Sequence, residues 1–181
     1  MTNKIAWVLS LISSGILSIY SLNHVYKYIS YPLEYTYYYW SIETDLMIWF
    51  YILYMILDLG IGFIFYRNEM DLMTGWLHHI YYIMFFVHVL RKDIAFMTNL
   101  LFLEEIPTLI MSIGKVIPYL RNDLLFGLSF LFTRIVYHSY LIYRVLKCNI
   151  CYYLSVPLLI ALGMHFYWFY KWCNNYIYKY N

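Results

Sequence analysis

Hydrophobic residues along the chain fall into six long runs, and short polar segments separate them. A helix of roughly 20 mostly apolar residues crosses a bilayer core, and every run is close to that length. The pattern predicts an all-α fold, a polytopic transmembrane helical bundle of about six spans with both termini on one side. Because the connections are short, successive helices are expected to pack as antiparallel neighbours. The predicted spans are residues 5–23, 46–66, 73–90, 94–114, 123–145 and 152–172.

The runs follow one another so closely that we expect one bundle rather than separate domains. We assign residues 1–45 to the first transmembrane helix and a Tyr-rich loop, residues 46–172 to the transmembrane bundle, and residues 173–181 to a short polar tail. The loop contains Pro32 and Glu34, so it is too polar to cross a membrane but could hold a short interfacial helix. No small-residue cleavage site clearly ends the first run, which favours a retained helix.

The composition supports a lipid environment. Of the 181 residues, 64% are hydrophobic and only 12% are charged, which is more apolar surface than one soluble core of this size can bury. Much of the tyrosine lies at the ends of the runs, where amphipathic rings favour the headgroup region. The net charge of +2, without a run of Lys or Arg, argues against nucleic acid as a partner. Lys and Arg are divided almost evenly between the two ends of the bundle, so they indicate no orientation, and the oligomeric state stays open.

Ionisable residues also occur near the middle of the predicted spans. A charge at the bilayer centre costs about 2.5 to 3.5 kcal/mol on insertion scales, so such groups usually face the bundle interior and find partners. We therefore expect them to meet in one shared polar chamber. They are Asp58, His78, His79, Glu104, Glu105, Arg134 and His165.

Helical spacing adds polar or small residues to the same faces as these charges. Three carboxylates at depth meet only one permanent cation, Arg134, so at least one carboxyl group is protonated or a histidine carries the compensating proton. We expect Arg134 to pair with Glu105, an arrangement that can also be purely structural. His78 and His79 point roughly 100° apart, so one is expected to face the chamber and the other a neighbouring helix. The three stripes are Tyr54, Asp58 and Gly62; Thr98, Glu105, Thr108 and Ser112; and Gly127, Arg134 and His138.

The cysteines and histidines follow no familiar metal-binding pattern. Cys148 and Cys151 lack a second CxxC pair, and an odd total of three gives no disulfide framework. Membrane di-iron enzymes use several boxes with HxxxH and HxxHH spacing, whereas this chain has a single HH at His78 and His79. Phosphate-binding loops and the GxSxG elbow of hydrolases are also missing from the sequence. We therefore expect no metal ion and no bound cofactor.

Several short motifs occur in a fixed order on successive runs: Tyr54 with Asp58-Leu59, Leu77-His78-His79, Leu103 to Thr108, Phe132-Thr133-Arg134, and an aromatic last helix around Trp168. This set, spread over residues 46–172, resembles the TLC domain. That family includes ceramide synthases, which join a fatty acyl-CoA to a sphingoid base, proteins linked to membrane lipid composition, and a component near the protein translocon. Ceramide synthases carry an HD and a second Asp after the paired His, which this chain lacks. Glu105-Ile106-Pro107-Thr108 looks more like the non-synthase TLC domain-containing proteins.

The residues and the resemblance together lead to one main hypothesis and two alternatives. The main hypothesis is a protein of membrane lipid homeostasis in the endoplasmic reticulum membrane, with membrane lipids as partners and an acyl lipid bound inside the bundle. Its expected lipid-binding residues are Tyr54, Asp58, Thr108, Arg134 and His138. The first alternative is an acyl-CoA-dependent lipid N- or O-acyltransferase of ceramide-synthase type, with acyl-CoA as substrate and catalytic residues His78, His79 and Glu105. The second is a non-catalytic structural or translocon-associated membrane protein whose buried charges only lock helix packing.

Overall fold

Helices account for nearly all of the computed structural model, which describes residues 3–33, 41–65, 67, 72–149 and 151–180. No β-strand occurs among these residues, so the predicted all-α fold is confirmed. The predicted interfacial helix falls largely on residues 34–40, outside the described residues.

Three of the predicted runs form unbroken helices and three are interrupted by a segment of other helical type. The unbroken helices are α1 (Asn3–Tyr28), α3 (Ile42–Phe65) and α9 (Ser155–Tyr180). The third run is a π-helical turn η2 (Leu72–Leu77) followed by α4 (His78–Arg91). The fourth is α5 (Ala95–Thr98), the 3-10 segment η3 (Asn99–Glu105) and α6 (Ile106–Val116). The fifth is α7 (Asp123–Phe130), the π-helical η5 (Leu131–Tyr137) and α8 (His138–Lys147), and short 3-10 turns η4 (Pro118–Leu120) and η6 (Tyr152–Leu154) precede α7 and α9.

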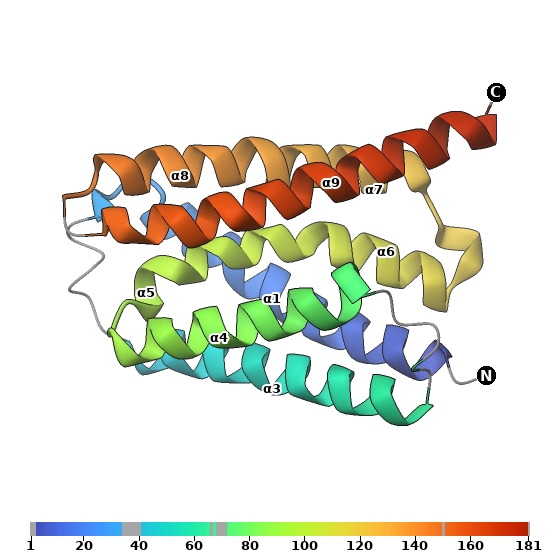
Figure 1. Ribbon diagram of the computed structural model, residues 1–181, viewed down its shortest axis with the longest axis horizontal. Helices are drawn as coiled ribbons and strands as arrows, with labels where there is room; N and C mark the ends of the chain where they lie inside the picture. The colour runs from blue at the N-terminus through green and yellow to red at the C-terminus, as the bar shows by residue number, and fades with distance from the viewer. Residues whose placement is uncertain (1–2, 34–40, 66, 68–71, 150, 181) are drawn as a thin grey trace.

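Successive helices run in opposite directions, so the start of α1 and the end of α9 lie at the same end of the bundle (Figure 1). α1, α3 and α4 form one side of the bundle, and α7, α8 and α9 form the other. The segment α5–η3–α6 runs between the two sides and contacts α1, α3 and η5. The predicted antiparallel packing is confirmed, because α3 contacts α4, α6 contacts α7, and α8 contacts α9.

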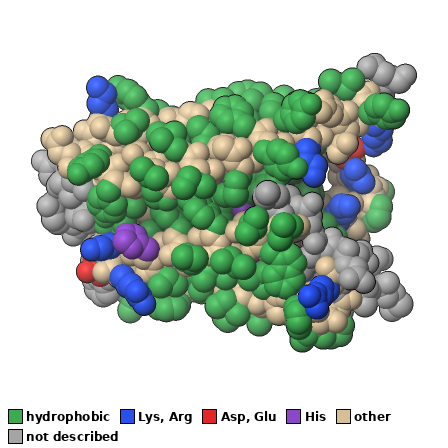
Figure 2. All heavy atoms as spheres, viewed as in Figure 1, with side chains coloured by type: hydrophobic (Ala, Val, Ile, Leu, Met, Phe, Trp, Pro, Cys, Tyr) green, Lys and Arg blue, Asp and Glu red, His purple; other side chains and the backbone are tan. Residues whose placement is uncertain are grey.

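The outer surface of the bundle is suited to lipid along its middle. Hydrophobic side chains cover the central band of the face in Figure 2, and Lys and Arg gather toward its two ends. The third predicted span, residues 73–90, corresponds to η2 and α4 (Leu72–Arg91), and this segment is not among the described helices that are long and apolar enough to cross a membrane. His78, His79 and His88 lower its mean hydropathy. Among the described residues there are five such helices, Ala6–Tyr28, Ile42–Phe65, Ala95–Val116, Asp123–Lys147 and Tyr152–Lys179.

The fourth run is the central element. Buried residues make up 61% of the most apolar stretch of Ala95–Val116, against 28% in Ile42–Phe65, so the fourth run packs against protein where α3 largely faces outward. Phe102 is 1% exposed and lies in a stacked arrangement with Phe86 of α4. The two adjacent carboxylates of this run are therefore surrounded by other helices and not by lipid.

Pro107 explains why this run is not a continuous α-helix. Proline has no N–H, and its ring crowds the carbonyl four residues earlier, which belongs to Leu103. The N–H of Ile106 bonds that carbonyl instead, in the tighter 3-10 register. Glu104 and Glu105 thus come at the end of η3, where the tighter winding directs them toward different neighbours.

The two ends of α9 differ from expectation. Cys148 and Cys151 are joined by a disulfide across the turn between α8 and α9, whereas the cysteine count indicated no disulfide. A turn brings two residues that are three positions apart close enough for this bond. The sequence argument considered only the total number and spacing of the cysteines, so it did not predict a bond within one turn. At the other end α9 continues to Tyr180, so residues 173–180 of the segment that we assigned to a short polar tail are helical.

Gly127 lets α9 approach α7 closely, as its place on the polar stripe of the fifth run suggested. A Cβ at this position would overlap the indole of Trp172. Any larger residue would therefore push α9 away. This contact holds the helix that carries His165 against the segment that carries Arg134.

Candidate functional site

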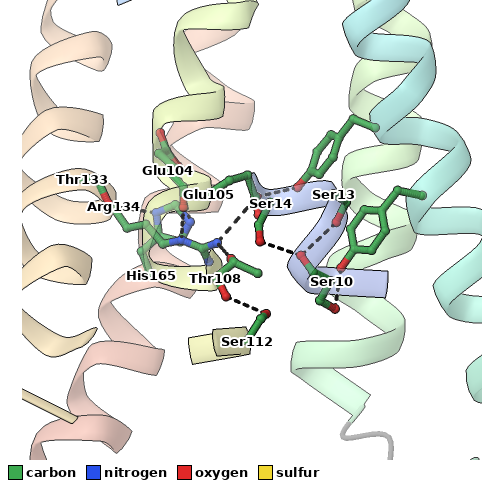
Figure 3. Close-up of polar contacts among 12 residues, drawn as sticks. Ser10, Ser13, Ser14, Glu104, Glu105, Thr108, Ser112, Thr133, Arg134 and His165 are labelled. Atoms are coloured by element: carbon green, nitrogen blue, oxygen red, sulfur yellow. Dashed lines mark hydrogen bonds and ion pairs between the residues drawn. The ribbon is translucent and has the colours of Figure 1, made fainter. Parts of the chain in front are cut away.

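Arg134 lies at the centre of a buried polar cluster (Figure 3). Its Nη2 is 3.7 Å from Glu105 Oε1 and donates a hydrogen bond of 2.9 Å to Thr108 Oγ1. Its Nε donates to the backbone carbonyl of Glu104 at 2.8 Å. Arg134 and Glu105 are 8% and 7% exposed, so the predicted ion pair is confirmed and lies away from solvent. The ring of Phe130 covers the guanidinium carbon, with its centroid 5.4 Å away.

Glu105 has a second partner on α3. The hydroxyl of Tyr51 donates to Glu105 Oε1 at 2.9 Å. The Tyr51 ring is fixed by edge-to-face contacts with Phe86 and Phe102, whose centroids lie 5.4 and 5.3 Å away. A buried carboxylate with both an ionic and a hydroxyl partner recovers much of the cost of leaving water. The Tyr51–Glu105–Arg134 chain thus ties three helical runs together.

Glu104 points to the opposite side, toward α8 and α9. Its Oε1 lies 2.7 Å from His138 Nδ1, and its Oε2 lies 3.8 Å from His165 Nε2. Both histidines are 1% exposed. The other nitrogen of each ring contacts a backbone carbonyl, that of Leu158 for His138 and that of Arg134 for His165, each at 2.9 Å. Since a carbonyl can only accept, these outer nitrogens carry hydrogen and the inner nitrogens face the carboxylate.

The π-helical turn η5 makes one of these carbonyls available. The N–H of His138 bonds the carbonyls of Thr133 and Ile135 and passes over that of Arg134. His165 on α9 bonds the Arg134 carbonyl from the side. Single π turns of this kind occur frequently at functional sites because they re-aim side chains and carbonyls. The η5 turn re-aims a carbonyl and a side chain here. It leaves the Arg134 carbonyl free for His165, and it also carries the Arg134 guanidinium.

A small cavity lies beside the cluster, and residues of α4 and α9 form part of its lining. Its volume is about 20 Å³, which is room for about one water. Figure 2 shows a trace of histidine among hydrophobic side chains on the face that it draws. The polar part of the lining is Tyr51, His78, Tyr82, Glu104, Glu105, Arg134, His138 and His165. The rest of the lining includes Tyr81 and Phe85 of α4 and Pro157, Leu158 and Ala161 of α9, and Tyr81 donates to the Pro157 carbonyl at 2.6 Å.

His78 faces this cavity from α4. Its Nδ1 is buried and has no hydrogen-bond partner in the described part of the chain, and the same holds for the indole nitrogen of Trp168. The two rings are in contact, with centroids 5.0 Å apart. An unpaired buried polar atom costs about 1 to 3 kcal/mol, so a hydrogen-bonding group placed here would be held firmly.

His79 and Asp58 form a separate pair between α4 and α3. His79 Nε2 lies 3.3 Å from Asp58 Oδ2, and His79 Nδ1 contacts the Gly75 carbonyl at 2.6 Å. The expectation that one of the two adjacent histidines faces the chamber while the other holds a neighbouring helix is confirmed. Neither Asp58 nor His79 lines the cavity. The predicted single chamber is thus two groups, the Arg134 cluster and the Asp58–His79 pair.

The remaining expected site residues lie around these groups. Thr108 accepts from Arg134, and His138 bonds Glu104. The Tyr54 hydroxyl lies 3.1 Å from Ser10 Oγ of α1. Ser14 bonds the Ser10 carbonyl of its own helix at 2.5 Å, so its hydroxyl is satisfied within α1.

Three members of the cluster were not among the expected catalytic or lipid-binding residues. Glu104 and His165 were recognised as charges at depth but given no role, although both follow from the same depth argument. Tyr51 gave no signal, because one tyrosine among 24 is not distinctive. Its position three residues before Tyr54 on one helical face is the only sequence clue.

No family model, curated protein or solved structure matches this chain. What the site can do therefore follows from its own groups. Glu104 and Glu105 can accept hydrogen bonds, Arg134 and His78 can donate them, and histidines beside carboxylates can exchange protons with a bound group.

Proposed function

We propose that this chain is an integral membrane protein of lipid homeostasis, which binds the polar end of an acyl lipid in the cavity between α4 and α9. The observation that carries the proposal is that the Arg134 cluster, buried among apolar helices, borders a small cavity whose lining also contains apolar side chains of α4 and α9. Polar groups at this depth are costly unless they serve a partner or a path. A lipid is a ligand that can approach such a site directly from the bilayer.

The size of the cavity limits which part of the lipid enters. About 20 Å³ accommodates a hydroxyl, carbonyl or amine group but no hydrocarbon chain. The acyl chain would lie outside the cavity, along the apolar surface of α4 and α9 next to the buried Phe85 and Ala161. His78 would bond the polar end, and Glu105 and Arg134 would set the local charge. This narrows the expected lipid-binding residues to Arg134 and His138, which line the cavity, and leaves Asp58, Tyr54 and Thr108 in supporting positions.

The resemblance to the TLC domain supports the same proposal. The motif residues of the resemblance include His78, Glu105 and Arg134, which lie together at the cavity. We further propose that Leu72–Arg91 is a sixth span, because it lies beside α3 with His78 and His79 turned toward protein groups. The endoplasmic reticulum membrane is the location in line with this resemblance.

Lipidomics of cells that express variants of the chain tests the proposal. Wild-type protein is expected to shift the phospholipid or sphingolipid profile of the host, and Glu105→Gln is expected to abolish the shift because it removes a charge at the cavity. Asp58→Asn is the matched control, since it changes a buried carboxylate outside the cavity lining. Identical profiles for empty vector, wild type and both variants would contradict a lipid role and favour a purely structural one.

A second candidate, lipid acyltransfer, is favoured by the buried Nδ1 of His78, which has no partner among the described residues and stands beside the cavity. In this reaction a lipid amine or hydroxyl attacks the thioester carbon of an acyl-CoA. The new N–C or O–C bond forms, the C–S bond breaks, and CoA leaves as the thiol. His78 would take the proton of the nucleophile and pass it to the leaving sulfur.

Release of CoA from purified protein tests this second candidate. His78→Ala is expected to stop release from an acyl-CoA given with a panel of amine and hydroxyl lipids. His79→Ala is expected to keep most of it, because His79 is turned toward Asp58. If only His79→Ala lost activity, His79 and not His78 would be the base, which contradicts the assignment made here. If the wild-type protein released no CoA, the acyltransfer reaction would be ruled out.

A further inference from the structure

Glu104, His138 and His165 come from three different helical segments and point at one spot. Among the described residues they are the group of His, Cys, Asp and Glu side chains whose possible ligand atoms all lie within 4.8 Å of one another. All three are buried, at 6%, 1% and 1% exposure. We propose that they form a binding site for a divalent transition-metal ion of the zinc class, with one coordination position open to the cavity.

The distances fit a small ion. Zinc binds nitrogen and carboxylate oxygen at roughly 2.0 to 2.2 Å, so neighbouring ligand atoms in a tetrahedral site are roughly 3.4 Å apart. The separations of 2.7 Å from Glu104 Oε1 to His138 Nδ1 and 3.8 Å from Glu104 Oε2 to His165 Nε2 lie on either side of that value, and one ligand atom from each residue lies within 4.8 Å of the others. Modest side-chain shifts would therefore bring all three groups onto one ion. The ion would take the place of the hydrogen that bridges Glu104 and His138.

The outer nitrogens of both histidines are already fixed as a metal site requires. Metal-bound histidines almost always donate their second N–H to a carbonyl or carboxylate, which sets the tautomer and the ring orientation. His138 does so to the Leu158 carbonyl and His165 to the Arg134 carbonyl. The lone pairs of His138 Nδ1 and His165 Nε2 are then directed at Glu104. The π-helical turn that makes the Arg134 carbonyl available is part of this arrangement.

The fourth position faces the cavity. Two histidines and one glutamate form a ligand set of catalytic zinc sites, in which water or substrate occupies the remaining position. Glu104, His138 and His165 all line the cavity, and its volume of about 20 Å³ has room for one water. Water bound to such an ion is activated as a nucleophile near neutral pH.

Charge also favours a cation here. Glu105 neutralises Arg134 at 3.7 Å, so the carboxylate of Glu104 is left without a permanent counter-ion among the groups it contacts in the structure, both of which are histidines. The sequence pattern led us to expect no metal ion, because the three ligands are spread over separate runs with no short spacing. Their convergence depends on the 3-10 and π-helical segments.

Metal analysis of the purified protein tests the proposal. The chain, isolated in detergent through a tag without histidine and loaded with Zn²⁺, is expected to retain about one ion per chain after desalting. X-ray absorption at the zinc edge is expected to show nitrogen and oxygen ligands at roughly 2.0 to 2.1 Å and no sulfur at roughly 2.3 Å, which separates this site from the cysteines. Glu104→Gln, which keeps size and a hydrogen-bond acceptor, is expected to weaken zinc affinity by more than about 100-fold, since changes outside the ligand shell alone cost roughly 10- to 100-fold.

His165→Asn is the second test variant, and it is also expected to lose zinc affinity. The control is His88→Ala, which changes an exposed histidine and is expected to bind zinc like wild type. Zinc is also expected to raise the unfolding temperature of wild type and His88→Ala but not of Glu104→Gln, which shows that a folded variant lacks the site. Wild type that retains no zinc, or Glu104→Gln and His165→Asn that retain it as tightly as wild type, would overturn the proposal. Metal content is measured without any lipid substrate, so this result is independent of the proposed lipid function.

Discussion

The Arg134 cluster and the Asp58–His79 pair are built from the same residue types at similar depth, yet they differ in connection and surroundings. The cluster joins α3, η3, α6, η5, α8 and α9 through several bonds and borders a cavity. The pair joins two adjacent helices through a contact of 3.3 Å and lines no part of that cavity. Buried charge alone therefore does not mark a functional site. The groups of the cluster share hydrogen-bond partners, and the cavity beside them has room for one further small group. These two features distinguish the cluster from the pair.

The largest expected effect is the loss of the charge at the centre of the cluster. Arg134→Leu leaves Glu105 buried without its cation, which costs about 3 to 5 kcal/mol in comparable buried pairs. Among the variants described here, we expect Arg134→Leu to have the lowest thermal unfolding midpoint, measured by fluorescence in detergent. Arg134→Leu combined with Glu105→Leu is expected to recover much of the loss. A loss in Arg134→Leu no larger than that in Asp58→Asn would erase the distinction between the two groups.

A change in helix packing is expected to come next. Gly127→Ala places a methyl group against Trp172, and overpacking of this kind costs about 1 to 3 kcal/mol. Because Trp172 holds α9 in place, the same change should weaken the cluster through His165. Gly163→Ala on α9 is the control, since a Cβ there meets nothing within 4 Å. Equal unfolding midpoints for the two alanine variants would show that the close approach of α7 and α9 does not matter.

Removal of one hydroxyl from the cluster is expected to have a smaller effect. Tyr51→Phe keeps the ring packing and deletes the donor at 2.9 Å from Glu105, which costs about 1 kcal/mol. The free energy of unfolding in a denaturant titration measures it, with Tyr170→Phe at a 65% exposed site as the control. A Tyr51→Phe variant as stable as the control would mean that Glu105 is satisfied without α3.

The smallest effect is expected at the pair. Asp58→Asn retains a hydrogen-bond acceptor for His79, and polar contacts between membrane helices are worth about 0.6 kcal/mol on average. The unfolding midpoint should fall slightly while the cellular lipid profile remains that of wild type. A variant that loses the lipid effect at unchanged stability would instead move the functional site toward α3.

Simple rules predicted much of the fold and part of the site. Depth and charge balance led to the Arg134–Glu105 pair, and the angle between neighbours on a helix led to the separate orientations of His78 and His79. The six hydrophobic runs appear as helices in the predicted order, and within the described residues five of them are long and apolar enough to cross a membrane by themselves.

The rest depends on backbone geometry that the hydrophobic pattern does not register. The 3-10 segment before Pro107 turns Glu104 and Glu105 toward different partners, and an ideal helix would not have indicated which. The π-helical turn around Arg134 has no sequence signal comparable to proline, yet it determines the bond made by His165. The Cys148–Cys151 disulfide likewise depends on the turn between α8 and α9.

The most direct test of the proposed function is to locate a bound lipid by photo-crosslinking. A fatty acid or long-chain base with a diazirine in its chain would be reconstituted with the purified protein in nanodiscs, illuminated, and mapped by peptide mass spectrometry. Labels are expected on α4 and α9 near Phe85 and Ala161, and Glu105→Gln is expected to reduce them. Labels confined to outward residues such as Phe132 and Val136, at equal yield in wild type and Glu105→Gln, would contradict a lipid site between α4 and α9.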